Sequence, residues 1–195
     1  MNELFFRNTP QLETKRLLLR KLGPEDVKDI FEYASDKEVT QYMSWDTHKT
    51  IEDSKGFINF TLDRYLRDDA GEWGIILKET GKFIGAMGFP WVDKKNNRAE
   101  IGYVLGRRYW GKGLMPEAVR RVLQFAFNDM KLNRIECVHA LANEKSGSVM
   151  LKAGMTFEGI AREKMFAKGK YWDMKQYAIL RSDWMKCVRV GEFND

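Results

Sequence analysis

The chain has 195 residues, 44% of them hydrophobic and 31% charged, which is typical of a single globular domain with a sizeable core. No apolar run approaches the ~18–20 residues that span a membrane, and the N-terminal residues lack the apolar core of a signal peptide, so we expect a cytoplasmic protein that does not bind membranes. The net charge is +5, but the basic residues are scattered, which favours a local anion site over a nucleic-acid platform.

The N-terminal third is predicted to form one strand and two helices. Residues 16–22 are mostly apolar and predict a short strand. The sequence Gly-Pro-Glu-Asp at 23–26 then begins a helix that reaches about Ala34, because proline and acidic residues suit a first helical turn. Residues 51–68 predict a second helix, since their apolar side chains recur at helical spacing.

The middle of the chain is predicted to form three strands and a long helix. Residues 72–105 contain three apolar segments, which a tight turn at Thr80-Gly81 and a polar loop at 93–98 separate. A helix follows, in which Leu114 begins an apolar stripe that ends at Met130.

The C-terminal part continues with a strand at 133–141 and a short helix at 143–154 that Gly154 ends. Two strands flank the turn at 167–170, and the last residues form a tail that could be helical or loose. The order of elements predicts a mixed α/β arrangement with one sheet.

The loop before the long helix carries two glycines separated by one residue, Gly111 and Gly113. Glycines let the backbone approach a ligand closely, and a helix N-terminus offers unpaired amides, so the loop could hold a phosphate or pyrophosphate. A flexible loop with a surface lysine explains the pattern equally well. The loop is not a dinucleotide-binding fingerprint, because a third glycine is missing. It is not a P-loop either, because the sequence Gly-Lys-Ser/Thr is missing.

Several motifs in order carry a resemblance to a known family. The sequence RYWGKG at 108–113 matches the Arg/Gln-x-x-Gly-x-Gly/Ala signature, AEIGYVL precedes it, and NEKSGSVMLKAGMTFEG follows it. In these motifs the chain resembles the GNAT acetyltransferases, over nearly its whole length to about Trp184. The segments LETKRLLLRKLGPEDVKDIFEY and WDTHKTIEDSKGFI are similar to the RimJ/RimL-type branch, which acetylates protein N-termini.

The resemblance implies a fold and a domain division. The fold is the α/β GNAT fold, with a single mixed, mostly antiparallel, twisted sheet that is splayed between its fourth and fifth strands and flanked by helices. Residues 1–185 would form the acetyltransferase domain and residues 186–195 a C-terminal tail. Relatives of this branch are monomers or homodimers, and either state is compatible with the sequence.

The resemblance also implies acetyl-CoA as the donor substrate. Backbone groups of Tyr103, Val104 and Leu105 would pair with the pantetheine arm as an added strand does, and Asn143 would hydrogen-bond to the same arm. For Asn143, a helix N-cap is the alternative. The pyrophosphate would contact the backbone amides of the loop and first helical turn, which comprise Arg108, Trp110, Gly111, Lys112, Gly113, Leu114 and Met115.

Two residues are candidates for catalysis. Glu100 stands where some GNAT enzymes place a glutamate base, and the alternative is a solvent-facing strand residue. Ser146 matches a serine that lies near the acetyl-CoA sulfur in RimL-like enzymes, and the alternative is an N-cap. A strand amide such as that of Val104 could stabilise the oxyanion.

Two positions depart from the family pattern. Met150 stands where many GNAT enzymes have a tyrosine acid, and Met165 stands where some RimL-like enzymes have a glutamate. Glu163 could replace that glutamate only if no bulge separates it from Met165. The general acid is therefore left open.

We expect an acetyl-CoA-dependent N-acetyltransferase that acts on a primary amine, foremost a protein N-terminus. A polyamine, amino sugar or amino acid is the alternative acceptor, and a non-catalytic acyl-CoA sensor is the alternative class. Only two cysteines and two histidines are present, with no carboxylate at ligand spacing, so no metal site is expected.

Overall fold

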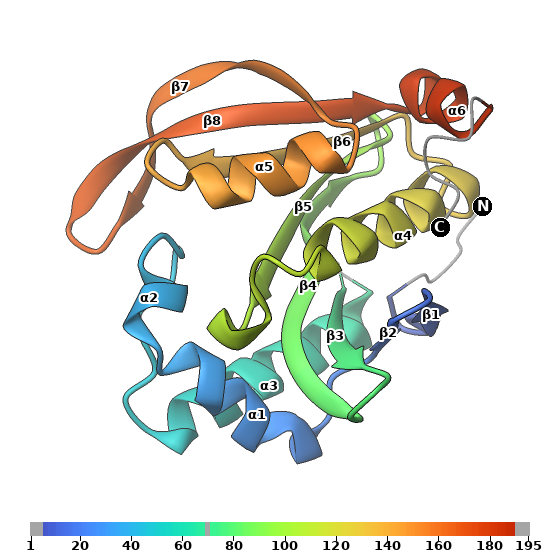
Figure 1. Cartoon of the computed structure of the whole chain (residues 1–195). Coiled ribbons are helices and arrows are strands. Elements are labelled where there is room, and N and C mark those ends of the chain that lie inside the picture. The colour runs from blue at the N-terminus through green and yellow to red at the C-terminus, as the bar shows by residue number, and fades with distance from the viewer. Residues whose placement is uncertain (1–5, 69–70, 190–195) are drawn as a thin grey trace.

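The computed structural model describes residues 6–68 and 71–189 and forms one sheet with helices on both faces (Figure 1). The N-terminal elements are β1 (Leu12–Glu13), β2 (Leu17–Arg20), the 3-10 turn η1 (Pro24–Asp26), α1 (Val27–Ala34), α2 (Lys37–Thr40) and α3 (Ile51–Arg67). The middle elements are β3 (Glu72–Leu77), β4 (Lys82–Asp93), β5 (Arg98–Leu105), the 3-10 turn η2 (Arg107–Tyr109) and α4 (Leu114–Asn128). The C-terminal elements are β6 (Arg134–Ala140), α5 (Glu144–Lys152), β7 (Thr156–Ala167), β8 (Lys170–Leu180) and α6 (Arg181–Arg189).

The sheet has eight strands in the order β1-β2-β3-β4-β5-β6-β8-β7. Its neighbours are antiparallel except β5 and β6, which run parallel. The parallel pair has partners only from Arg98 to Glu100, so residues 101–105 of β5 diverge from β6. Next to this point, β4 carries one extra residue between Gly88 and Trp91, which is a bulge. The expected splay is therefore present.

The splay lies between β5 and β6 in the numbering of the structure. The sequence had predicted it between the fourth and fifth strands. The two-residue strand β1 adds one to the count, because Leu12 and Glu13 pair with Leu19 and Leu18 of β2. A strand of two residues has no periodicity of its own and forms only where a partner strand is presented to it.

The two faces of the sheet carry separate apolar layers. On one face, α4 buries Ala118, Val119, Val122 and Leu123 completely, together with alternate residues of β5 and β6. On the other face, helices α1 and α3 pack Ile30 and Ile58 against β2, β3 and β4. Alternation along β5 therefore separates Ala99, Ile101, Tyr103 and Leu105 from Val104. Side chains at successive positions of β5 thus point to opposite faces of the sheet at the splay.

The predicted strands and helices are present, whereas β1 and α2 were missed. The helix predicted to open at Pro24 starts as η1 and continues as α1 to Ala34. Sequence reasoning did not predict α2, although its N-cap Asp36 accepts a hydrogen bond from the Glu38 amide. The tail is helical through Arg189, so the expected boundary at residue 185 falls inside α6, and residues 190–195 lie outside the described residues.

Candidate active site

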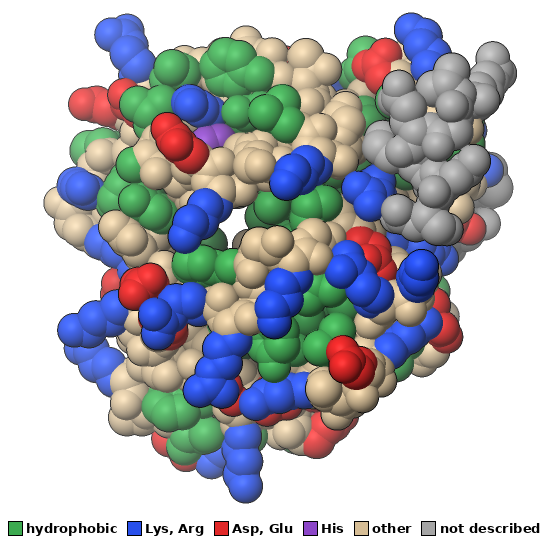
Figure 2. Space-filling model, viewed as in Figure 1, with side chains coloured by type: hydrophobic (Ala, Val, Ile, Leu, Met, Phe, Trp, Pro, Cys, Tyr) green, Lys and Arg blue, Asp and Glu red, His purple; other side chains and the backbone are tan. Residues whose placement is uncertain are grey.

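The splay opens into a cavity of about 760 Å³ that extends from β5 to α5 and α2. Figure 2 shows the molecule hollowed here, with an opening through the view and Lys and Arg side chains around it. Ten of the predicted site residues line the cavity, namely Tyr103, Val104, Leu105, Trp110, Gly111, Gly113, Leu114, Met115, Asn143 and Ser146. Segments far apart in sequence thus converge on one hollow.

The glycine loop at the N-terminus of α4 has the backbone geometry expected of an anion cradle. Gly111 and Gly113 have φ values of +74° and +73°, a left-handed conformation that favours glycine. Among the described residues, no acceptor is present for the backbone amides of residues 111–115. Five free amides at the positive end of a helix dipole fit a pyrophosphate group. This geometry favours the anion site over a merely flexible loop.

An ion pair between the half-exposed Arg16 and the buried Glu117 contacts this loop. The Glu117 carboxylate, in the first turn of α4, lies 2.6 Å from the Arg16 guanidinium and also accepts hydrogen bonds from the Arg16 amide and the Thr14 hydroxyl. Arg16 Nη1 in turn donates to the Lys112 carbonyl, 2.9 Å away. Burial alone would raise the pKa of Glu117, but these hydrogen bonds outweigh it and hold the pKa below its ordinary value. The sequence analysis had missed both residues.

We expect Glu117→Gln to lower the free energy of unfolding by about 2 kcal/mol at neutral pH, because the buried acceptor loses its charge. A lowered folded-state pKa stabilises the protein above the unfolded value of 4.5 and ceases to do so as the pH falls through the folded value. Urea unfolding at several pH values should therefore show a difference from wild type that shrinks in acid. Glu52→Gln, in the exposed first turn of α3, is the matched control and should change little. A difference that stays constant into acid would contradict this origin.

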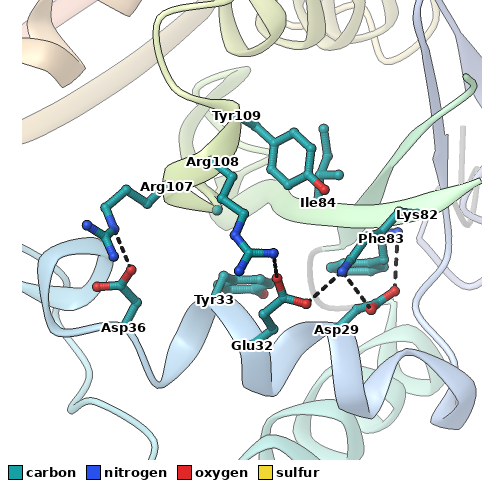
Figure 3. Close-up of a pocket in the computed structure, with 11 residues that line it drawn as sticks. Asp29, Glu32, Tyr33, Asp36, Lys82, Phe83, Ile84, Arg107, Arg108 and Tyr109 are labelled. Carbon is teal, nitrogen blue, oxygen red and sulfur yellow. Dashed lines mark hydrogen bonds and ion pairs between the residues drawn. The ribbon is translucent and has the colours of Figure 1, made fainter. Parts of the chain in front are cut away.

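Arg108 contributes its backbone to the loop, whereas its side chain turns away from the cavity. Figure 3 shows Arg108 directed at Glu32 of α1, and the two groups lie 3.3 Å apart. Arg107 similarly pairs with Asp36 at 2.7 Å, and Lys82 of β4 pairs with Glu32 at 2.7 Å. These ion pairs line a smaller pocket of about 300 Å³ and attach the turn η2 to α1 and the segment before α2. Arg108 therefore acts as an anchor of the loop.

The side chain of Trp110 occupies a backbone acceptor of Leu105 that a ligand could otherwise use. Its indole Nε1 donates to the Leu105 carbonyl at 2.7 Å, so one acceptor site of that carbonyl is already occupied. The same ring lies 4.6 Å from the Lys145 ammonium, a cation–π contact that the sequence analysis did not foresee. Of the three strand residues expected to pair with pantetheine, Val104 directs its backbone groups at Ala86 of β4, as Gly106 does at Ile84, so Tyr103 has the fewest competing contacts.

The start of α5 brings Asn143 and Ser146 to the cavity wall. Asn143 is the N-cap of α5, because its side chain accepts a hydrogen bond from the Ser146 amide at 3.4 Å. The helix-capping alternative is therefore present for Asn143 and absent for Ser146. The Ser146 hydroxyl instead lies 3.0 Å from the hydroxyl of Tyr103. Burial raises the pKa of Tyr103 well above its ordinary value, which keeps this hydroxyl protonated.

Glu100 is the last residue of β5 that pairs with β6, opposite Glu136. It is half-buried and does not line the cavity. Burial raises its pKa, the Lys164 cation and a hydrogen bond from Trp91 lower it, and the charge of Glu136 raises it, with a net upward shift. Glu100 lies three residues before Tyr103, so the two side chains project from opposite faces of the sheet. The carboxylate is thus placed on the side of the splay away from α5.

The two methionines that depart from the family pattern differ in burial. Met150 is a fully buried residue of α5, whereas Met165 is half-buried and pairs with Trp172 across the β7–β8 hairpin. A bulge lies between Ala161 and Met165, and Glu163 within it has a φ of +49°. The condition under which Glu163 could replace the missing glutamate is therefore not met.

Comparison with known proteins identifies the family. A family model described as an acetyltransferase (GNAT) domain matches residues 16–156. The chain is a GNAT acetyltransferase. An uncharacterized N-acetyltransferase, p20 of Bacillus licheniformis, is 38% identical over 175 residues, which cover 89% of this chain and 97% of that protein. A GNAT-family acetyltransferase structure from Bacillus anthracis superposes with a TM-score of 0.80 at 30% identity, covering 89% and 99% of the two chains.

The same fold is solved with the cofactor in RimL, a ribosomal-protein alpha-N-acetyltransferase in complex with coenzyme A. That structure has a TM-score of 0.79 at 19% identity and covers 88% of this chain and 98% of its own. The acetyltransferase described here uses acetyl-CoA as its donor, and its cradle of free amides fits the pyrophosphate of that molecule. Within residues 6–68 and 71–189 there is neither a helix able to span a membrane nor a cluster of His, Cys, Asp and Glu suited to a metal.

Proposed function

We propose that this acetyltransferase transfers the acetyl group of acetyl-CoA to the N-terminal amine of a protein or peptide by direct attack on the thioester. Glu100 would act as the general base and Ser146 would contact the leaving sulfur. The Val104 amide pairs with Ala86 of β4, so an amide on the splayed edge of β5, that of Tyr103 or Leu105, would stabilise the oxyanion that forms on the carbonyl oxygen. The cofactor-binding residues would be those that line the cavity, with Arg108 and Lys112 contributing backbone atoms.

The position of Glu100 at the point of divergence carries this mechanism. The strand rise of ~3.3 Å per residue places Glu100 about 10 Å from Tyr103 along β5, on the other face of the sheet. A base about 10 Å from the residue next to the leaving thiol would accept the proton of the amine through a water molecule. It would lie on the side of the splay from which the acceptor amine enters. Its raised pKa brings it closer to the working pH, where a general base is most effective.

The acceptor side favours an extended substrate. Tyr42 lines the cavity next to α2, and its ring lies 5.9 Å from that of Trp172 on the β7–β8 hairpin. Beyond this contact, the paired rings of Phe166 and Tyr171 are 63% and 62% exposed. An open apolar wall of this kind suits several residues of a peptide better than a small enclosed amine. Among the relatives, the ribosomal protein uS5 alanine N-acetyltransferase of Escherichia coli is 22% identical.

A small-molecule amine is the second candidate, because the spermidine N(1)-acetyltransferase of Vibrio cholerae is also 22% identical. A polyamine would need carboxylates that are free to pair with it. The acidic residues of the smaller pocket, Asp29, Glu32 and Asp36, are already paired with Lys82, Arg108 and Arg107. In the cavity, Glu38 pairs with Arg107 as well, which leaves Glu144 as the one lining carboxylate without an ion pair among the described residues. These contacts make a polycation the weaker candidate.

Release of free thiol from acetyl-CoA tests the proposal directly. The purified protein would be assayed with peptides that differ in their first residue, with the same peptides blocked at the N-terminus, and with polyamines, amino sugars and amino acids. We expect release with free peptide N-termini and none with blocked ones. Thiol release with a polyamine and with no peptide would show that the acceptor is a polyamine. Tight binding of acetyl-CoA without thiol release in the presence of any of these acceptors would favour a sensor role.

A further inference from the structure

A layer of polar side chains lies beneath α5, next to the cavity and within an otherwise apolar core. It consists of Tyr103 on β5, Cys137 and His139 on β6, and Tyr177 on β8, of which the last three are at most 6% exposed. Burial raises the pKa of the Cys137 thiol and lowers the pKa of His139, so these groups stay neutral. Tyr103 differs from the others because its hydroxyl reaches the cavity wall at Ser146.

The Tyr103 hydroxyl has one proton and lies within hydrogen-bond reach of two oxygen atoms of Ser146 and of the Cys137 thiol beneath it. It lies 3.0 Å from Ser146 Oγ and 3.1 Å from the Ser146 backbone carbonyl. A serine in a helix readily donates its hydroxyl proton to a carbonyl of the preceding turn, and the proton is then unavailable to a ligand. A hydrogen bond from Tyr103 to Ser146 Oγ fixes that oxygen as an acceptor, and the Ser146 proton can then point into the cavity that both residues line.

We propose that Tyr103 is a positioning residue: its hydroxyl donates to Ser146 Oγ and holds the Ser146 hydroxyl as a hydrogen-bond donor toward the sulfur that leaves from the thioester. This inference rests on the proposed function. As the C–N bond to the acceptor forms, the C–S bond breaks and its electron pair stays on sulfur. The amine proton passes to Glu100 through water, and the thiolate takes a proton from solvent after release. The pair would thus supply the stabilisation that Met150 cannot supply.

Steady-state kinetics give the first test. We expect Tyr103→Phe to lower kcat about tenfold, the value of one hydrogen bond that matters in the transition state, with no change in the KM for acetyl-CoA. Ser146→Ala should lower kcat at least as much, and the double variant should equal Ser146→Ala alone, because Tyr103 acts through Ser146. Tyr177→Phe is the matched control, since it removes a hydroxyl from the same layer and should leave kcat unchanged. Multiplicative losses in the double variant would contradict the proposal.

A second readout does not depend on turnover. The thiol of bound coenzyme A can be titrated by the ultraviolet absorbance of its thiolate, with the desulfo-coenzyme A complex as the blank. We expect Tyr103→Phe and Ser146→Ala to raise the pKa of the bound thiol by about one unit each, and Tyr177→Phe to leave it unchanged. The groups around Tyr103 and Ser146, namely Cys137, His139, Tyr177, Glu144 and Lys145, are present in both proteins of the Tyr103→Phe comparison and cancel in the difference.

The two readouts separate this inference from the proposed function. If no acceptor supports turnover but the bound thiol titrates as expected, the acceptor assignment fails and the role of Tyr103 stands. If turnover occurs but the bound thiol titrates identically in wild type and Tyr103→Phe, Tyr103 has only a packing role and the inference is overturned.

Discussion

Gly111→Asp is expected to weaken acetyl-CoA binding by about a hundredfold, whereas Gly111→Asn should weaken it by less than about tenfold. A carboxylate about 5 Å from a pyrophosphate charge costs about 3 kcal/mol at an effective dielectric constant near 20, which corresponds to the larger factor. No atom lies within 4 Å of a Cβ at this position, so both side chains fit. Asn and Asp tolerate the left-handed conformation similarly, and the two variants therefore differ mainly in charge.

Isothermal titration of acetyl-CoA into each variant measures this effect. Gly169→Asp is a second control, because Gly169 has a φ of +76° and open space but lies in the β7–β8 turn. It should bind acetyl-CoA as wild type does. The deficit of Gly111→Asp should also diminish at high salt, since the repulsion is electrostatic. Equal affinities of the Asp and Asn variants would remove the pyrophosphate from this loop.

Glu100→Gln is expected to lower kcat by about 10²- to 10⁴-fold, the usual contribution of a general base. The raised pKa means that the carboxylate of wild type is protonated, and therefore inactive as a base, up to a higher pH than an ordinary glutamate. The wild-type profile of kcat/KM should thus have an acid limb from Glu100, followed by a rise as the acceptor amine is deprotonated. In Glu100→Gln only the second feature should remain.

Two neighbouring substitutions should move the acid limb in opposite directions. Glu136 raises the pKa of Glu100 by repulsion, so Glu136→Gln should shift the limb to lower pH. Lys164 lowers that pKa, so Lys164→Met should shift the limb to higher pH. Both variants should keep most of the maximal rate, because neither removes the base. A limb that moves in neither variant would assign it to another group and remove Glu100 as the base.

The repeating elements and the use of acetyl-CoA could be predicted from the sequence alone. Apolar periodicity locates the long strands and α4, because a side chain's face is fixed by its position within the same element. Glycines at 111 and 113 indicate, for a similarly local reason, a loop whose backbone can approach a ligand, and in the structure both have a positive φ. The order of motifs also predicted the splay and the use of acetyl-CoA.

The roles of individual side chains at the candidate site could not be predicted in this way. Arg108 turns to Glu32, which lies 76 residues earlier, and Tyr103 meets Ser146 across 43 residues of sequence. The carbonyl of Leu105 is engaged by Trp110, and Glu117 anchors the cradle through Arg16. Each of these contacts depends on how two elements are packed against each other. Sequence spacing therefore determined which residues reach the splay, and only the tertiary structure decided which partner each side chain has there.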